Sequence, residues 1–286
     1  MQLYVTELTD RSFLNVSGAE RYSFLDSLLT RKISDDCMAE GKWTAAALLT
    51  PQGKLLDDFL IYATPEALVI DCAGSRRDEL FKRLMMYKLR SQVEITTLSG
   101  TPFVVWTPSM APDIAEPNNK DANATLPESH LDPRSPLLGA RFVTEPDVEN
   151  AAIKALAEWH HLRIQLAIPE GPTEMPPGSV FPLDYGLHLR NAISFDKGCF
   201  IGQEVTSRTY RRGTLKKAIF GVEISVNSGL DQVPHSLPAE ITSDLGARGT
   251  LIAKNESEGF ALLKRDVSDQ ELLTCGSFNI KLKTTT

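Results

Sequence analysis

The sequence predicts an α+β protein that ends in a small β-barrel, and three observations predict this fold class. In the first half, strand-like segments alternate with helix-like segments through short turns, which is typical of ferredoxin-like α+β layers rather than of a sandwich. Residues 108–136 contain six prolines and no periodicity, which predicts a long surface loop or linker. Beyond residue 214, short strands follow one another at close spacing, which predicts a barrel.

Composition and charge narrow the class of protein. The chain has 286 residues, 42% of them hydrophobic, and is long enough for two or three domains with their own cores. Its formal net charge of −7 argues against a dedicated nucleic-acid binder. No apolar run approaches the roughly 20 residues that cross a bilayer, and the N-terminal residues do not resemble a secretory or transit signal. The four cysteines form no CxxC pair, which favours free thiols over a disulfide framework or zinc site. We therefore expect a cytoplasmic protein without membrane contact.

The first 107 residues supply most of the predicted α+β layer. Alternating residues predict strands, and apolar residues at helical spacing predict helices. In chain order the pattern predicts a strand over 13–16, a helix over 19–29, a hairpin over 42–63 with its turn at 50–54, a strand over 66–73, a helix over 75–90, and strands over 93–98 and 102–107.

The second half continues with fewer helices. After the proline-rich segment, the pattern predicts a strand over 141–146 and a helix over 151–166. Barrel strands are predicted over 215–224, 238–244, 246–257, 258–265 and 278–283. The three tryptophans are expected in cores, and the histidines at 160, 161 and 188 lack the spacing of a metal site.

The segment DKGCFIGQEVTSR, residues 196–208, carries the chemistry of the chain. Cys199 follows Lys197, a cation that would favour the thiolate. The glycines at 198 and 202 permit positive φ angles or close approach of the backbone to a ligand. Gln203 and Glu204 supply hydrogen-bonding groups for a ligand. These residue types together indicate a site built around a reactive thiol.

A basic stretch follows the cysteine. Residues 205–217 contain five cations and no acidic residue, in an acidic protein. Carboxylate or phosphate matches the planar fork of arginine, so this stretch is a candidate anion site, with Arg208 as its first cation. The alternative is a solvated basic face on the first barrel strand.

The order of residues in this segment closely resembles the K-G-C-(aromatic)-x-G-Q-E-x-x-x-R signature of the YgfZ-type folate-binding proteins. These are relatives of the glycine-cleavage T-protein that act in iron–sulfur cluster assembly or repair. The segments FLNVSGAERYSFLDSLLT, ALLTPQGKLLDDFLIY and LRIQLAIP also resemble parts of that family. The similarity covers most of the chain apart from the proline-rich loop.

The resemblance implies a three-part ring. Two ferredoxin-like subdomains, interleaved over residues 1–213, and a C-terminal barrel over residues 214–286 would surround a central channel that holds tetrahydrofolate. Cys199 would lie where the folate-binding region meets the barrel, near the ligand cavity. The cations that follow would border the mouth of the channel and meet the glutamyl carboxylates of folate.

The glycine-cleavage aminomethyltransferase is the nearest alternative. In that enzyme a D-F-x-G-(basic)-E pattern without cysteine takes the place of the signature, so Cys199 favours the YgfZ side. The glutamate that holds the pterin there corresponds to Gln165 here. The stretch GKLLDD retains Asp57 and Asp58, and side chains alternate across a strand, so only one of the two can face a cavity. The resemblance assigns Asp58 to the cavity, because the family's G-(Arg/Lys)-x-x-x-D pattern ends there. The alternative is that both are surface carboxylates.

Our first hypothesis is a tetrahydrofolate-binding accessory protein for assembly, insertion or repair of [4Fe–4S] clusters. Cys199 is its predicted reactive thiol and Asp58 the second predicted catalytic group. The residues assigned to folate are Asp57, Asp58, Gln165, Asp184, Lys197, Gln203, Glu204 and Arg208. Cubane clusters normally take four thiolates, so a transient cluster at Cys199 would be shared with assembly machinery or a client enzyme.

Two other hypotheses stay open. A folate-dependent aminomethyltransferase would use Asp57 or Asp58 to orient the N5 and N10 nitrogens of folate. A non-enzymatic RNA-binding module would use the basic stretch 205–217 and would lose affinity steeply as salt rises. The overall acidity disfavours this third hypothesis.

Overall fold

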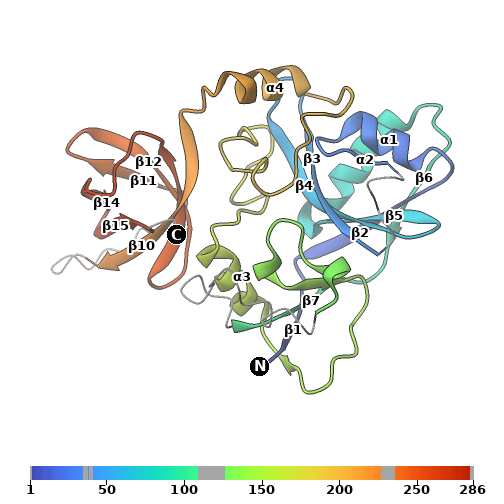
Figure 1. Cartoon of the computed structure of the whole chain (residues 1–286), viewed down its shortest axis with the longest axis horizontal. Helices are drawn as coiled ribbons and strands as arrows, with labels where there is room; N and C mark the ends of the chain where they lie inside the picture. Colours follow the sequence, from blue (N-terminus) through green and yellow to red (C-terminus); the bar gives the residue numbers. More distant parts are fainter. Residues whose placement is uncertain (1, 35–37, 39–40, 109–125, 227–235, 284–286) are drawn as a thin grey trace.

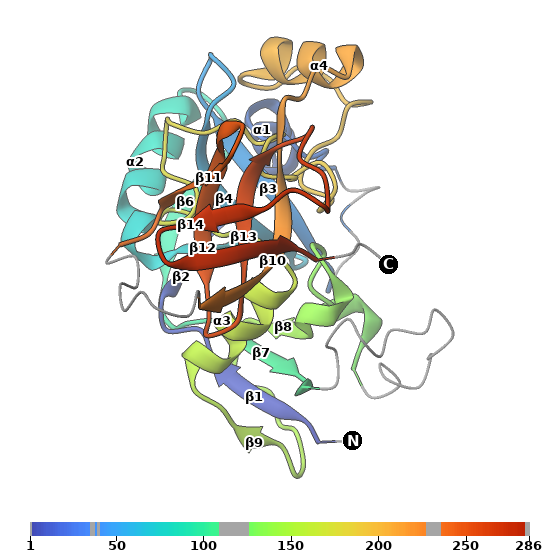
Figure 2. The same cartoon turned by 90° about the vertical axis from the view of Figure 1, so that its left-hand side faces the viewer.

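The computed structural model describes residues 2–34, 38, 41–108, 126–226 and 236–283. They form a five-stranded sheet with two helices, a four-stranded sheet with one helix, and a closed six-stranded barrel. Figures 1 and 2 show the barrel on one side of the molecule and the five-stranded sheet on the other. The predicted α+β class with a C-terminal barrel is confirmed.

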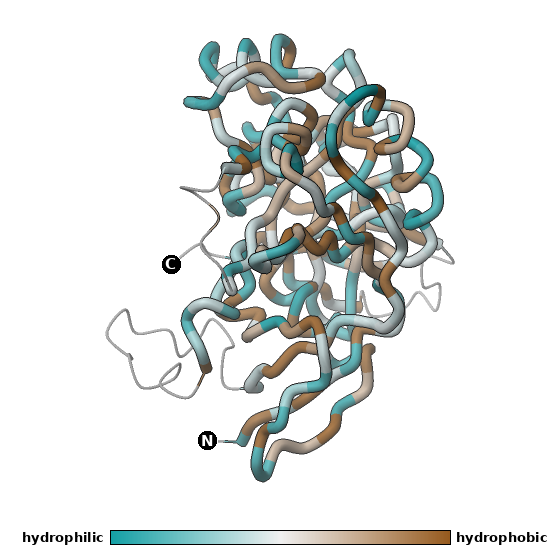
Figure 3. The backbone as a smooth tube through the Cα atoms, turned by 90° about the vertical axis from the view of Figure 1, so that its right-hand side faces the viewer, coloured by the Kyte–Doolittle hydropathy of each residue, from teal (hydrophilic) through white to brown (hydrophobic). Residues whose placement is uncertain are grey.

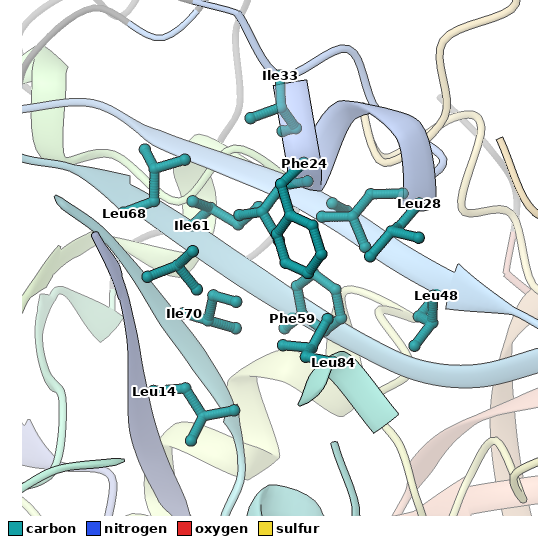
Figure 4. Packing of buried hydrophobic residues seen from close by; sticks show 14 of the residues in the cluster. Leu14, Phe24, Leu28, Ile33, Leu48, Phe59, Ile61, Leu68, Ile70 and Leu84 are labelled. Carbon is teal, nitrogen blue, oxygen red and sulfur yellow. The ribbon is translucent and has the colours of Figure 1, made fainter. Parts of the chain in front are cut away.

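The five-stranded sheet is antiparallel and is buried on both faces. Its strands, in spatial order, are β3 (Trp43–Leu49), β4 (Leu55–Ala63), β5 (Ala67–Ala73), β2 (Arg11–Ser17) and β6 (Glu94–Leu98). One face packs against α1 (Arg21–Leu28) and α2 (Arg77–Lys88), which follows the short helix η1 (Gly74–Arg76). Figure 4 shows this core, in which Phe24 and Leu84 from the helices meet Phe59 and Ile61 of β4.

The opposite face of the same sheet is covered by a segment without long helices or strands. Side chains that alternate with the first set, such as Ala45 and Leu60, pack against Met175, Tyr185 and Phe200. Residues 166–202 therefore serve as the second cover of the sheet (Figure 1). This arrangement explains why β3, β4 and β5 read as nearly continuous apolar runs.

The four-stranded sheet lies below this segment in Figure 1. Its order is β8 (Ala140–Phe142), β7 (Phe103–Trp106), β1 (Tyr4–Glu7) and β9 (Ala152–Ile153), with β1 and β9 parallel. Helix α3 (Leu156–Gln165) packs on it through Trp159 and Leu162. The barrel closes in the order β10 (Lys217–Val226), β13 (Glu258–Lys264), β12 (Gly246–Lys254), β11 (Ala239–Ser243), β14 (Leu273–Cys275) and β15 (Phe278–Leu282).

Two predictions about connecting segments are wrong. The alternative of a basic face on the first barrel strand is wrong for the three arginines: residues 203–212 form helix α4 (Gln203–Arg212), bounded by left-handed glycines at 202 and 213, and β10 begins at Lys217. The end of the proline-rich segment is not a surface linker, because Asp132 and Arg134 are buried and residues 128–130 and 136–138 form short 3₁₀ helices, η4 and η5. Residues 109–125 of that segment lie outside the described residues. The helix predicted over 151–166 starts at Leu156, because β9 occupies 152–153.

A buried network of ion pairs joins the two sheets, α3 and the segment 166–202. Arg141 of β8 is fully buried and pairs with Asp71 of β5, with Asp132 at 2.9 Å and with Glu170 at 3.4 Å. The four cations and four anions of the network balance, and its members are Arg11, Arg134, Arg141, Arg163, Asp71, Asp132, Glu170 and Glu174. Each charge is desolvated but has several partners, which is the condition under which buried charges are tolerated.

We predict that Arg141→Met lowers the free energy of unfolding by about 3–5 kcal/mol, because it leaves buried carboxylates without their cation. Chemical denaturation measures the loss. The control is Arg83→Met, which removes a partly exposed pair with Glu79 and should cost less than about 1 kcal/mol. Similar losses in the two variants would contradict the role given to the buried network.

Candidate functional site

The side chains of Asp57 and Asp58 point to opposite faces of β4, because side chains alternate along a strand. Asp57 is buried beside Arg76, whose Nε donates to Oδ1 at 2.9 Å. Asp58 lies on the other side, where its Oδ1 accepts the backbone N–H of Gly171 at 2.9 Å. Asp58 lines the narrow cavity described next, whereas Asp57 lines none of the cavities described here.

The cavity at Asp58 is narrow. Strands β3 and β4 form one wall and the segment 166–202 forms the other. Besides Asp58 its polar lining consists of Arg11, Arg134, Arg190 and Tyr185. The volume open to the centre of a water-sized sphere is about 20 Å³, which is room for a water molecule rather than for a ring.

Burial dominates the electrostatics of Asp58. It raises the pKa of this carboxyl, and nearby Glu170 acts in the same direction, whereas Arg11 and Arg134 oppose the rise. The folded protein therefore holds a proton on Asp58 to a higher pH than an exposed aspartate would. A neutral carboxyl in a cavity can donate one hydrogen bond and accept another.

A wider pocket adjoins the narrow cavity at Arg11, which lines both. By the same measure its volume is about 390 Å³, within the usual range of small-molecule sites. Its polar lining includes Asp10, His160, Arg163, Glu170 and Glu174. These groups offer acceptors and donors close together, which suits a ligand ring that presents both.

Tetrahydrofolate can be tested against these two cavities. A reduced pterin carries donors and acceptors on one edge, and the carboxylates and guanidinium groups of the wide pocket match that pattern. The wide pocket also has the volume, whereas the narrow cavity does not. The hydrogen-bonding groups of the wide pocket therefore fit a pterin. Asp58 does not line this pocket, because the backbone of Gly171 lies between them.

Cys199 is an exposed thiol on a fixed loop. Cys72 and Cys275 are buried, whereas Cys199 is exposed, and Cys37 lies outside the described residues. On one side of it Lys197 is clamped to the end of α1: its Nζ donates to the carbonyl of Leu29 at 2.8 Å. Lys197 also donates to the Arg31 carbonyl and pairs with Asp26. Burial lowers the pKa of Lys197, although Asp26 opposes this.

The other side of Cys199 is fixed by Phe200 and Gly202. Phe200 is buried in the apolar cluster that covers the sheet. Gly202 has a φ of +79°, and a Cβ there would lie 2.6 Å from the Thr50 carbonyl oxygen. Glycine is therefore required at 202. At Gly198 no such need exists, because a Cβ would meet no atom within 4 Å. Phe200 and Gly202 thus fix the loop against the rest of the protein, while the thiol of Cys199 stays in solvent.

Helix α4 follows this loop at the outer edge of the molecule (Figure 3). Gln203 ties its start to the cysteine loop, since Nε2 donates to the Gly198 carbonyl at 3.2 Å. Tyr210 fixes its second half by stacking on Phe195, with ring centroids 3.7 Å apart. Glu204 and Arg208 lie on the exposed side of the helix.

The structure separates the predicted folate residues into three groups. Asp58 faces the cavities. Gln203, Glu204 and Arg208 lie on α4, whose open hollow shares no lining residue with either cavity. Asp57, Gln165, Asp184 and Lys197 line neither cavity. Asp184 instead lines a small pocket beneath α4.

Gln165 misses the wide pocket because of helix geometry. Arg163 lines that pocket, and side chains two residues apart on a helix point about 200° apart. The helix that the resemblance singled out therefore lines the wide pocket through Arg163 and Ile164 rather than through Gln165.

Sequence reasoning missed the charged residues that surround Asp58. Arg11 lies in a strand that reads as apolar, and Arg134 lies in the proline-rich segment. Glu170 and Glu174, in PEGPTE, look like loop carboxylates. A signal was present in LRIQLAIPEGPTE, where Arg163 precedes two carboxylates, but no local pattern predicts which arginine pairs with which acid.

Two further searches bear on partners. Within the described ranges, no group of three or more His, Cys, Asp or Glu side chains is placed to hold a metal ion. No helix in the part of the chain that the structure describes has the length and apolarity to span a membrane.

Comparison with known proteins gives a consistent group of relatives. The mitochondrial iron–sulfur cluster assembly factor IBA57 of Mus musculus is 29% identical over 281 residues, covering 91% of this chain and 77% of that protein. The human mitochondrial IBA57 factor is 29% identical over 265 residues, which cover 86% of this chain and 72% of the human protein. The IBA57 homolog of Neurospora crassa is 29% identical over 253 residues, and the chain spans only 57% of its length. No protein-family model matches the chain.

A solved structure shows the same fold. The glycine cleavage system aminomethyltransferase T from Bartonella henselae superimposes with a TM-score of 0.71 and covers 99% of this chain, at 12% sequence identity. At this identity the likeness concerns the fold alone.

We predict that Gly202→Ala lowers the free energy of unfolding by about 1–3 kcal/mol, because the left-handed backbone and the Thr50 carbonyl both oppose a side chain. Gly198→Ala is the matched control and should change stability by less than about 0.5 kcal/mol. Chemical denaturation of the two variants measures the difference. Equal losses would contradict the tight contact at Gly202.

A second prediction concerns pH. Because the pKa of Asp58 is raised in the native state, the stability that its neutral form contributes is fully present below the ordinary pKa of about 4 and is lost as pH rises through the native pKa. Asp58→Asn stays neutral, so its stability relative to wild type should rise between pH 4 and pH 8. Denaturation curves across this range measure it. A relative stability that falls with pH would mean that the arginines hold Asp58 ionised.

Proposed function

We propose that this chain belongs to the family of YgfZ-type proteins, and that it is an accessory factor in iron–sulfur cluster assembly on the fold of the glycine-cleavage aminomethyltransferase. Its relatives carry that role in their names. We further propose that it serves [4Fe–4S] clusters, that it binds tetrahydrofolate, and that Cys199 is the thiol it presents to a cluster or its carrier.

The observation that carries the proposal is the exposure of Cys199 between two anchored neighbours. Lys197 is fixed to the end of α1 and Phe200 to the core, so the thiol is presented to solvent from a loop that has little freedom. A side chain held in this way can meet a bulky partner without reordering the protein. Because a cluster normally takes four thiolates, the remaining ligands come from the partner that supplies or receives the cluster.

Tetrahydrofolate is proposed as the ligand of the wide pocket. Arg163, Glu170 and Glu174 would bind the ring edge there, and Asp58 lies behind the backbone of Gly171. When bound, tetrahydrofolate supplies N5 and N10 nitrogens that can carry a one-carbon unit. The chain itself contributes a pocket wall of fixed charges and, close by, the carboxyl of Asp58, whose pKa is raised by burial.

A folate-dependent aminomethyltransferase is the second candidate, and Asp58 is the observation that favours it. Its carboxyl is directed into a cavity and its pKa is raised by burial, which are two features of a functional acid. This activity would depend on Asp58 and would not need the thiol.

Complementation in cells that lack their own protein of this family separates the two candidates. We expect Cys199→Ala to lower the activity of a [4Fe–4S] client enzyme to the level of the empty vector, and Asp58→Asn to retain most of it. The reverse order of severity would support the aminomethyltransferase and contradict the proposed role of the thiol. Immunoblots confirm equal amounts of protein, and Lys82→Ala, at an exposed position of α2, is the control for a surface change outside both proposed sites.

A further inference from the structure

Helix α4 carries an arginine face that has no partner among the described residues. Arg208, Arg211 and Arg212 are exposed, and none of them makes a hydrogen bond or ion pair with any residue that the structure describes. Together with Gln203, Glu204 and Ser207 they line an open hollow of about 610 Å³. Arg208 and Arg212 are four residues apart, so their like charges destabilise the helix slightly. An acidic chain thus maintains an uncompensated cationic face.

The hollow has a second unsatisfied group at its base. Ser207 is 8% exposed, and among the described residues its hydroxyl has no hydrogen-bond partner. Buried hydroxyls are normally bonded. A hydroxyl and three guanidinium groups on one hollow all match an acceptor that carries negative charge.

An apolar pocket adjoins the arginine face. Val205 and Thr209 of α4 form one side, Phe181 and Leu215 the other, and the volume is about 160 Å³. An apolar cavity of about this size holds a benzene molecule. Val205 is three residues before Arg208, so the two side chains are neighbours on the helix surface. The pocket also contains the Asp184 carboxyl, whose pKa is raised by burial.

The backbone beside the thiol is open. A Cβ on Gly198 would meet no atom within 4 Å, so nothing inside the protein requires glycine there. A second chain could lie against this position and reach Cys199 next to it. The arginine face, the apolar pocket and the open backbone all border the segment 198–212.

We propose that this surface, named here the α4 surface (Gly198, Cys199, Val205, Arg208, Arg211 and Arg212), docks an acidic segment of a protein partner that carries one bulky apolar side chain. The carboxylates pair with the arginines, and the apolar side chain enters the pocket. A free anion would leave the pocket empty, and the net charge of −7 opposes a long nucleic acid. The inference rests on the proposed function, since it describes the protein to which Cys199 is presented.

The test uses a fluorescein-labelled synthetic peptide in which four glutamates flank one phenylalanine. Fluorescence anisotropy with the full chain at low salt should show saturable binding. We expect Arg211→Ala/Arg212→Ala to raise the Kd at least about tenfold, and a peptide with glycine in place of phenylalanine to bind wild type at least about tenfold more weakly. Lys82→Ala/Arg90→Ala is the control, since both residues are exposed on or beside α2, and should leave the Kd unchanged.

Three results would overturn the inference: equal weakening by the control pair, equal affinity for the glycine peptide, or tighter binding of an oligouridine than of the acidic peptide. The assay contains neither cluster nor folate. If the protein binds no peptide but still restores the client enzyme in the complementation assay, the docking surface is rejected and the proposed function stands.

Discussion

The buried ion network is the interaction on which the rest of the structure depends. Arg141 of one sheet meets Asp71 of the other, and Glu170 and Arg163 bring in the segment 166–202 and helix α3. Because every charge is desolvated, removing one leaves its partners uncompensated. The network thus fixes how the two sheets and the covering segment sit against each other, and with them the walls of both cavities. Asp58 lies beside this network, near Arg11 and Glu170, but is not one of its ion-paired members.

The covering segment connects the narrow cavity and the loop of Cys199 to one apolar cluster. Tyr185 and Met175 belong to this cluster and line the narrow cavity, while Phe200 belongs to it and holds the loop of Cys199. The thiol is therefore anchored to the same core that encloses the cavity, although it lines none of the described cavities. A ligand pocket and a protein-facing thiol can then coexist without sharing atoms. This division suits a protein that binds a small molecule and also meets a large partner.

Local pattern predicted much of the fold and part of the site. The helices near residues 21–28 and 77–88 and the barrel strands follow from periodicity, and alternation along β4 predicted that Asp57 and Asp58 point to opposite faces. The sequence did not reveal α4, since QEVTSRTYRR contains β-branched and basic residues and its limits depend on two left-handed glycines. It also placed Lys197 beside the thiol as an activating cation, whereas the folded chain directs its ammonium to the carbonyls of α1. Long-range pairs of this kind leave no local signal.

The most direct test of the account is an anaerobic calorimetric titration of wild type and Cys199→Ala with tetrahydrofolate. The account predicts saturable one-to-one binding with the same affinity in both proteins, because the thiol is separate from the proposed folate pocket. No heat of binding up to millimolar tetrahydrofolate would contradict the assignment of folate to these cavities. Binding to wild type that is lost in Cys199→Ala would contradict the separation of the two sites.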